Sequence, residues 1–342
     1  MPAGPGPSRR TVLGAAALTA VIALPALCGC SGDDPVRAAA PGLDVVVLSG
    51  AIAAEQDLIA RYEAARAAHT SLAKRIDPAI AHHREHLGVL RRHYVPGSGR
   101  QATDAPATST SPSPQRVPDV QAKALASLRT AEIQTAARYA ADAGKSAPGL
   151  AQLLASIGAC AAGHGASSTS GVAKKPMTQP STASLPPARG FTLEALQAAL
   201  ASEHAAVYGY GVLGSRLSGG QYEVAQTYWN AHRVQRDSLM ALLTARQAKP
   251  VAAAAAYRLP VRVTSTRTAA QLATRLEDDL TVAYVGLAGA QDAQLREQAA
   301  RAAQESMTSA VRWRTTGDLP LTHPAFPGLP ASALSPRPRP GH

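Results

Sequence analysis

The chain has 342 residues, of which 46% are apolar but only 4% are aromatic, and alanine is abundant. Alanine loses no side-chain entropy on entering a helix, so this composition favours helices that pack closely through small side chains. The formal net charge of +11 suits an anionic lipid surface, an acidic wall polymer or nucleic acid as a partner. Nucleic acid is the least favoured, because the sequence contains no zinc-finger spacing, RNA-binding signature or helix-turn-helix pattern.

The first 30 residues are predicted to be an export signal. Arg9 and Arg10 precede an apolar run that continues to about Leu27 and is short for a membrane span. The string SRRTVL resembles a twin-arginine signal, and the apolar run ends on LCGC, which resembles a bacterial lipobox. We therefore expect cleavage and lipidation at Cys30, which would hold the protein at the extracytoplasmic face of the plasma membrane. A plain secretory signal and an uncleaved anchor are the alternatives.

The first half of the mature chain is predicted to be a four-helix bundle at residues 43–164, after a tether at 31–42. Its helices are expected at about 43–93, with a break at Asp77-Pro78, and at about 119–143 and 148–162. Pro148 is favourable at a first helical position. A Ser/Thr/Pro/Gly insert at about 95–118 cannot bury enough apolar surface to fold alone.

The second half, residues 191–316, repeats this plan after a Ser/Thr/Pro linker at 165–190. Its helices are expected at about 192–217, 221–247, 268–290 and 292–313. Thr192 is positioned to cap the first of them, and Gly219-Gly220 supply the following turn. The Pro-rich tail at 317–342 is expected to be extended or disordered.

Each half is therefore expected to contain two helical hairpins with a long crossover between its second and third helices. Such a connection lets the second hairpin enter in the reversed direction, which is the ferritin-like topology of the four-helix bundle. The predicted fold is all-α, with two tandem ferritin-like four-helix bundles.

A glutamate precedes a tyrosine by seven residues four times in a chain with nine tyrosines. The pairs are Glu55 and Tyr62, Glu132 and Tyr139, Glu203 and Tyr210, and Glu277 and Tyr284. Seven residues make two helical turns, so both members of a pair lie on one apolar seam. A buried carboxylate needs a hydrogen bond, a counter-ion, a metal or a proton. The tyrosines are interpreted as structural residues of the seam, and the glutamates either join a hydrogen-bonded layer or bind metal.

Two sets of candidate metal ligands follow from these seams. They are Glu55, His83, His86 and Glu132 in the first half, and Glu203, His232 and Glu277 in the second. Di-iron bundles take a Glu from each of two helices and a Glu-x-x-His from each of the others, and no Glu-x-x-His occurs here. In the second half, Gln235 is aligned with His83. We expect at most one transition metal (Fe, Mn or Zn) per half, with the first half the better candidate, and a hydrogen-bonded layer is favoured over either site.

Neighbouring residues are given structural roles. His82 is expected on a solvated face, and Cys160 is expected to be a small apolar core residue rather than a nucleophile. His164 is a marginal addition to the ligands of the first half.

The second half resembles a known family over about residues 190–316. Its segments LEALQAALASEHAAVYGYGVLGSRL, AHRVQRDSLMALL, PVAAAAAYRLP and RLEDDLTVAY are similar to the ferritin-like domain of unknown function 4439 of high-GC Gram-positive bacteria. The resemblance implies a ferritin-like fold and leaves the activity open, and the first half matches more loosely, through Glu-x6-Tyr and HREHL. Ferritin-like relatives with complete ligand sets oxidise or store iron, and the missing Glu-x-x-His positions argue against carrying that activity over.

These observations favour an exported, lipid-anchored module that binds or scaffolds at the cell envelope, rather than an enzyme. Its expected partners are the membrane, through the lipid anchor, and an anionic envelope polymer or another protein. The alternative is a metal-binding protein or metal-dependent oxidoreductase that uses the Glu/His cluster of the first half.

Overall fold

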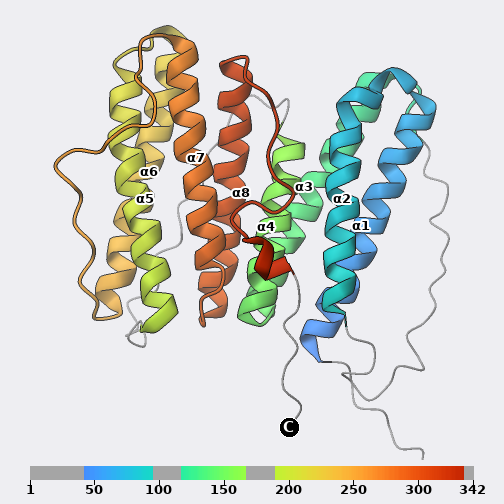
Figure 1. Ribbon diagram of the computed structural model, residues 1–342, viewed down its shortest axis with the longest axis horizontal. Helices are drawn as coiled ribbons and strands as arrows, with labels where there is room; N and C mark the ends of the chain where they lie inside the picture. The colour runs from blue at the N-terminus through green and yellow to red at the C-terminus, as the bar shows by residue number, and fades with distance from the viewer. Residues whose placement is uncertain (1–41, 95–116, 167–188, 335–342) are drawn as a thin grey trace, which may run out of the picture. The chain divides into compact units, whose positions relative to one another are not determined.

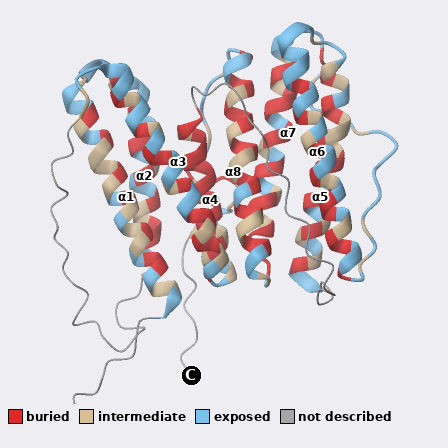
Figure 2. Ribbon diagram, turned by 180° about the vertical axis from the view of Figure 1, so that it is seen from behind, coloured by how far each residue is buried: buried red, intermediate tan, exposed pale blue. Residues whose placement is uncertain are grey.

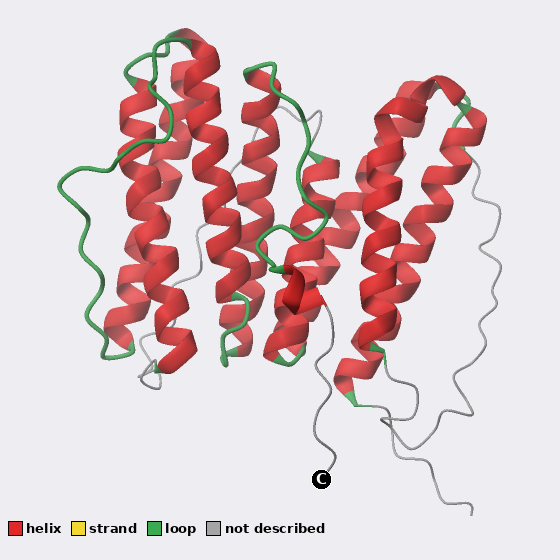
Figure 3. Cartoon of the chain, viewed as in Figure 1, coloured by secondary structure: helices red, strands yellow, loops and turns green. Residues whose placement is uncertain are grey.

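The computed structural model describes residues 42–94, 117–166 and 189–334. The predicted export signal with Cys30, the tether, and most of the insert and linker lie outside the described residues. Within the described ranges the regular structure is helical, with no strand (Figure 3). The α-helices are α1 (Leu43–Ala68), α2 (Ala73–His93), α3 (Gln121–Lys145), α4 (Pro148–Gly165), α5 (Gly190–Gly214), α6 (Gly219–Ala245), α7 (Thr266–Leu287) and α8 (Ala293–Thr316). The all-α prediction is confirmed. None of the described helices has the length and apolarity needed to cross a bilayer.

Two predicted helix boundaries are wrong. The break between α1 and α2 lies at the short 3-10 turn Thr70–Leu72, and Pro78 lies inside α2. Pro78 is the sixth residue of α2, where its missing N–H removes one intrahelical hydrogen bond. The chain leaves the helix earlier, at His69, whose backbone has φ -132° and ψ 76° and whose Nε2 donates to the carbonyl of Pro118 at 2.9 Å. Thr192 does not cap α5, which begins two residues earlier, and its hydroxyl instead accepts the backbone N–H of Gln291 at 3.3 Å.

Caps and turns elsewhere follow local rules. Ser265 forms a capping box with Thr268 at the start of α7, and Asp292 caps α8 by accepting the backbone N–H of Leu295 at 2.8 Å. Gly219 begins α6 with a φ of 55°, a conformation that glycine adopts without strain. The turn between α5 and α6 lies at residues 215–218, so the prediction that Gly219-Gly220 form it is wrong by a few residues, and the two glycines are the first residues of α6.

The first and third helices of each half run antiparallel. Glu55 of α1 is hydrogen-bonded to Tyr139 of α3, and Tyr62 of α1 is bonded to Glu132 of α3, so the contacts run in opposite order along the two helices. The corresponding residues of α5 and α7 pair in the same crossed way. A glutamate and a tyrosine two turns apart on each of two antiparallel helices give two such pairs.

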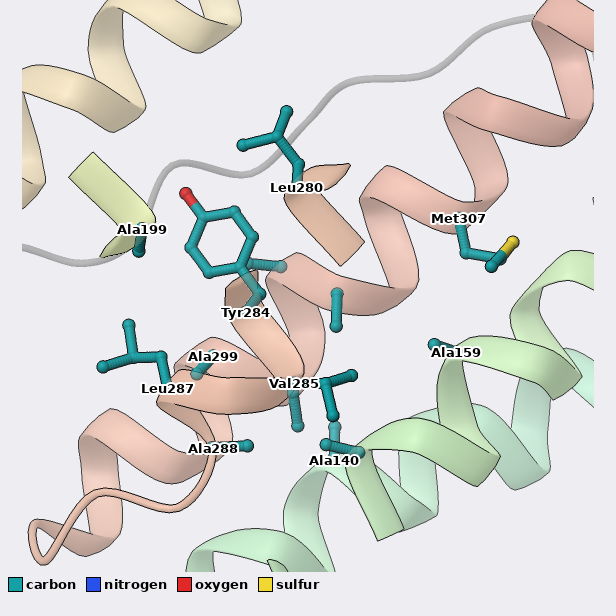
Figure 4. Packing of buried hydrophobic residues seen from close by; sticks show 14 of the residues in the cluster. Ala140, Ala159, Ala199, Leu280, Tyr284, Val285, Leu287, Ala288, Ala299 and Met307 are labelled. Atoms are coloured by element: carbon teal, nitrogen blue, oxygen red, sulfur yellow. The ribbon is translucent and has the colours of Figure 1, made fainter. Parts of the chain in front are cut away.

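Small side chains dominate the packing where the two halves meet. Every residue from 153 to 163 of α4 is buried, and α4 packs along both α3 and α8 (Figure 2). Figure 4 shows small side chains such as Ala140 of α3 and Ala159 of α4 in this core, with Ala159 facing Met307 of α8. Alanine and glycine let helix backbones approach closely, which explains how an aromatic-poor chain fills its core.

Arg296 of α8 joins the two halves by hydrogen bonds. Its guanidinium donates to the carbonyls of Ala143 and Gly144 at the end of α3, at 3.1 and 3.2 Å. It also donates to the carbonyls of Ala290 and Gln291 at 3.0 and 2.8 Å. The side chain therefore binds carbonyl groups at the end of α3 and in the connection between α7 and α8.

The tail up to residue 334 is not the free segment that its composition predicts. It runs from the end of α8 onto the first half (Figure 1). The carbonyl of Ala325 accepts a hydrogen bond from Nε2 of His86 at 2.8 Å, and that of Pro327 accepts one from Ser156 at 2.7 Å. The ring of Phe326 lies 5.1 Å from that of His86, centre to centre. Proline has no N–H but keeps its carbonyl, so a Pro-rich segment can bind a surface that offers donors.

Candidate functional site

The first half contains a buried histidine between two buried glutamates. Nδ1 of His83 lies 2.8 Å from Oε2 of Glu55, and Nε2 lies 2.9 Å from Oε1 of Glu132. All three residues are 0% exposed. They come from α2, α1 and α3, which the apolar seams bring together. Because carboxylates only accept hydrogen bonds, both ring nitrogens of His83 must donate.

The second half repeats this centre with the same atoms. Nδ1 of His232 lies 2.8 Å from Oε2 of Glu203, and Nε2 lies 3.2 Å from Oε1 of Glu277. His232 is therefore the counterpart of His83, and the alignment of Gln235 with His83 is wrong. Gln235 lies three residues further along α6, as His86 does along α2.

Tyrosines close both centres. Tyr139 donates to Oε1 of Glu55 at 2.6 Å and Tyr62 donates to Oε1 of Glu132 at 2.7 Å. In the second half, Tyr284 donates to Oε1 of Glu203 at 2.6 Å, and Tyr210 donates to Oε1 of Glu277 at 2.7 Å. Burial, and next the adjoining glutamate, raise the pKa of each of these four phenols. They therefore remain protonated donors.

The charged forms of the histidine and the two glutamates in the first centre stabilise one another. Burial disfavours the imidazolium of His83, but the carboxylates of Glu132 and Glu55 outweigh it and raise the pKa of His83 to about 10. Burial would likewise neutralise Glu55, but His86 and His83 lower its pKa to about 2. The pKa of Glu132 is also lowered, against burial, by His83 and His164. At neutral pH the centre is an imidazolium between two carboxylates.

A ferritin-type metal fits this arrangement poorly. His83 lies between the two carboxylates with both ring nitrogens engaged, so they cannot chelate one ion together while it is there. Nδ1 of His86 lies 3.2 Å from Oε2 of Glu55, and its Nε2 is used by Ala325. The structure does bring all seven predicted ligands into these two centres, and it arranges them as a hydrogen-bonded layer. One oxygen, Oε2 of Glu132, is buried without a hydrogen-bond partner among the described residues.

The two centres differ in their surroundings. In the second half, the indole N–H of Trp313 donates to the hydroxyl of Tyr210 at 2.8 Å, and Trp313 is only 2% exposed. In the first half, His164 of α4 approaches instead, with Nδ1 3.1 Å from Oε1 of Glu132. The first centre is thereby connected to further histidines, whereas an aromatic side chain packs on the second.

A cluster of three histidines and a cysteine adjoins the first centre. Nδ1 of His82 lies 3.1 Å from Nε2 of His164 and 3.4 Å from Sγ of Cys160. His323 of the tail packs its ring 5.0 Å from that of His164. The expectation that His82 lies on a solvated face is therefore wrong, because α4 and the tail cover it. Cys160 is buried as predicted, but it lies among histidines, and burial, followed by Glu132, raises the pKa of its thiol.

No sequence pattern pointed to His323. It lies in a Pro-rich segment without helical periodicity, far along the chain from the other members of the cluster. Only the path of the tail brings it to α4.

A cavity of about 360 Å³ opens beside this cluster. Apolar side chains form most of its wall: Ile76, Pro78, Leu125, Leu128, Val311 and Leu321. Lys74, Arg75 and Arg129 also line it, and none of them forms an ion pair with another described residue. Burial and the neighbouring Arg75 guanidinium lower the pKa of Arg129. The cavity thus combines apolar walls with uncompensated positive charge.

Sequence comparison assigns the second half to a family. A sequence profile of the domain of unknown function DUF4439 matches residues 195–331. A crystal structure of a conserved hypothetical protein from Mycobacterium tuberculosis is 36% identical, and the match covers 37% of this chain and 98% of that chain, with a TM-score of 0.36. This chain belongs to the DUF4439 family. The DUF4439 region begins in the first turns of α5 and ends in the tail, so it includes His323 and the residues that contact His86. No curated protein matches the chain.

Proposed function

We propose that this protein is an exported, lipid-anchored binding module of the cell envelope, and that its ligand is a small anionic amphiphile. The apolar part of the ligand occupies the cavity of the first half, and its carboxylate or phosphate group lies against Arg75 and Arg129. The observation that carries the proposal is the cavity itself, with apolar walls beside three cationic side chains that lack carboxylate partners among the described residues.

The dimensions and charges support this ligand class. A volume of about 360 Å³ is within the range of small-molecule sites, which are mostly apolar with a few polar groups that set orientation. Like charges such as Arg75 and Arg129 repel each other, and an anion between them removes that repulsion. Export and anchoring are supported by the arginine pair, the apolar run and the lipobox-like cysteine at residues 1–30.

The alternative, a metal-dependent oxidoreductase using Glu55, His83, His86 and Glu132, has less support. These side chains hydrogen-bond one another, and the second half repeats the Glu55–His83–Glu132 part of this centre with the same atoms. A redox metal also needs coordination positions open to a substrate, and the three residues of the first centre are fully buried.

Calorimetric titration with three ten-carbon probes tests the proposal. We expect decyl phosphate to bind, and decyltrimethylammonium and decyl maltoside to bind at least about tenfold more weakly, which corresponds to about 1.4 kcal/mol. The double variant Arg75→Met, Arg129→Met keeps the apolar stems and should lose about tenfold in affinity for decyl phosphate. Arg301→Met is the matched control, because its guanidinium lies on α8 outside the cavity lining and pairs with Glu297.

Three outcomes would overturn the assignment. Equal binding of the phosphate and maltoside probes would remove the role of charge. Unchanged affinity in the double variant would place the site elsewhere. Equal binding of dextran sulfate, which has no apolar chain, would indicate a polymer-binding surface instead.

A further inference from the structure

The cluster beside the first centre presents four metal-binding atoms to one point. They belong to His82, Cys160, His164 and His323, and they all lie within 4.8 Å of one another. The side chains come from α2, α4 and the tail, so three separate parts of the chain converge. No described carboxylate supplies an atom to this group of four.

Their spacing matches a tetrahedral zinc site. Zinc binds imidazole nitrogen at about 2.0–2.1 Å and thiolate sulfur at about 2.3 Å, so neighbouring ligand atoms stand about 3.3 Å (N to N) and about 3.6 Å (N to S) apart. The observed separations are 3.1 Å from His82 to His164, 3.4 Å from His82 to Cys160, and 3.8 Å from His164 to Cys160. Small side-chain shifts would complete the tetrahedron.

The outer hydrogen bonds orient the imidazoles toward that point. Nδ1 of His164 donates to Glu132, which leaves Nε2 to face Cys160 and His82. Nδ1 of His323 donates to the carbonyl of Pro324 at 3.3 Å, which directs Nε2 toward α4. Metal-bound histidines commonly donate their second N–H to a carboxylate or a backbone carbonyl in this way.

Gly163 of α4 makes room for the residue from the tail. A Cβ at this position would lie 2.8 Å from Nε2 of His323, which is too close for ordinary contact.

We propose that His82, Cys160, His164 and His323 form a zinc site that fastens the tail to the first half. One thiolate and three imidazoles suit a borderline-soft ion and exclude magnesium and calcium, which prefer oxygen ligands. Four protein ligands close the coordination sphere, so the site is structural rather than catalytic. On binding, Cys160 forms the Zn–S bond and its thiol proton passes to solvent, while the neutral imidazoles release none. This inference goes beyond ligand binding in the cavity and does not depend on it.

Cobalt substitution tests the site in the full chain, prepared in detergent with Cys28→Ser and Cys30→Ser so that Cys160 is the only thiol. We expect one zinc per chain by mass spectrometry. We also expect one cobalt per chain with tetrahedral d–d bands and a thiolate-to-cobalt charge-transfer band. Cys160→Ser should abolish that band, and His323→Gln should weaken binding at least about tenfold, the ratio that about 1.4 kcal/mol represents. His204→Gln on α5, outside the cluster, should change neither. Because His323 is in the tail, its variant leaves the helices intact, which circular dichroism would verify.

A second measurement addresses the fastening of the tail. Zinc should slow proteolytic cleavage within residues 317–334 in the wild type but not in His323→Gln. Cobalt binding without the charge-transfer band, or binding that Glu55→Gln abolishes while Cys160→Ser does not, would overturn the site. Equal cleavage of the tail with and without zinc would overturn its structural role. Failure of decyl phosphate to bind would leave all of these readouts unchanged, so the two proposals fail separately.

Discussion

Replacing the central histidine of the first centre tests the charge arrangement of the core. His83→Gln keeps a similar length and a donor for one carboxylate, but removes the cation between Glu55 and Glu132. Removing one partner of a buried ionic set costs about 3–5 kcal/mol, because the remaining charges stay buried without compensation. We expect a loss of that size in the free energy of unfolding at pH 7.

The pKa of His83 gives a second route to the magnitude. Its folded pKa of about 10 exceeds the ordinary value of 6.5, so the folded protein holds this proton more tightly than the unfolded chain. The resulting stabilisation is complete below pH 6.5 and disappears as the pH rises to about 10. At pH 7 roughly three pH units of this window remain, which at about 1.36 kcal/mol per unit gives about 4 kcal/mol. The two routes agree.

Urea unfolding followed by circular dichroism, with EDTA present, measures the effect. The free energy of unfolding of the wild type should exceed that of His83→Gln by about 3–5 kcal/mol at pH 7. This difference should shrink toward zero near pH 10. His82 and His323, whose lowered pKa values destabilise the fold below pH 6.5, are present in both proteins and cancel. His204→Gln, at a residue that is 8% exposed and bonded to the carbonyl of Val251, controls for the loss of a buried ring.

The second half offers an internal replicate. His232→Gln breaks the equivalent centre, and both tryptophans of the chain, Trp229 and Trp313, lie in that half. Trp313 is bonded through Tyr210 to Glu277, so its fluorescence should report the loss directly. A loss below about 1 kcal/mol for His83→Gln, or parallel pH profiles of variant and wild type between pH 6.5 and 10, would refute a buried imidazolium as the source of stability.

Further predictions concern the packing and the anchor. Arg296→Met removes a guanidinium bonded to four carbonyls and should lower the free energy of urea unfolding by about 2–3 kcal/mol; an unchanged midpoint would contradict its role as a tie. Gly209→Ala would place a Cβ 2.5 Å from Cδ1 of Leu276 and should destabilise by about 1–3 kcal/mol. Gly211→Ala, with only Trp229 at 3.9 Å, should stabilise by up to about 1 kcal/mol, and losses of equal size at both glycines would refute the packing argument. Cys30→Ser should release the protein into the medium, whereas retention on the membrane would show that lipidation does not hold it.

Much of the fold follows from the sequence because helical periodicity is local. The spacing of Glu55 and Tyr62, and of its three repeats, places both side chains of each pair on a buried seam, and the structure buries all four glutamates. The spacing does not show which residue of another helix each glutamate contacts. A heptad gives two residues one helical face, but only the antiparallel approach of α3 determines that Glu55 meets Tyr139 rather than Tyr62.

The remaining features depend on contacts between segments distant in sequence. Asp77-Pro78 is a strong local signal for a break, yet Pro78 lies inside α2 and the break comes earlier, at Thr70–Leu72. His82 appears exposed on its own helix and is covered only when α4 and the tail arrive. The tail has no periodicity to predict its path, because its carbonyls bind donors such as Ser156 on α4.

Comparison of the two similar halves distinguishes residues that support the shared architecture from residues that could confer a specific function. The Glu–His–Glu centre with its crossed tyrosines occurs in both halves with the same atoms, so it supports the architecture that they share. A specific function should instead depend on residues that differ. Trp313 packs on the second centre, whereas around the first there are His164, Cys160 and a cavity whose cations form no ion pair with another described residue. The tail, which belongs to the second half in sequence, completes this region with His323. The ligand site that we propose therefore lies in the first half, and the second half supplies both packing and the segment that covers this region.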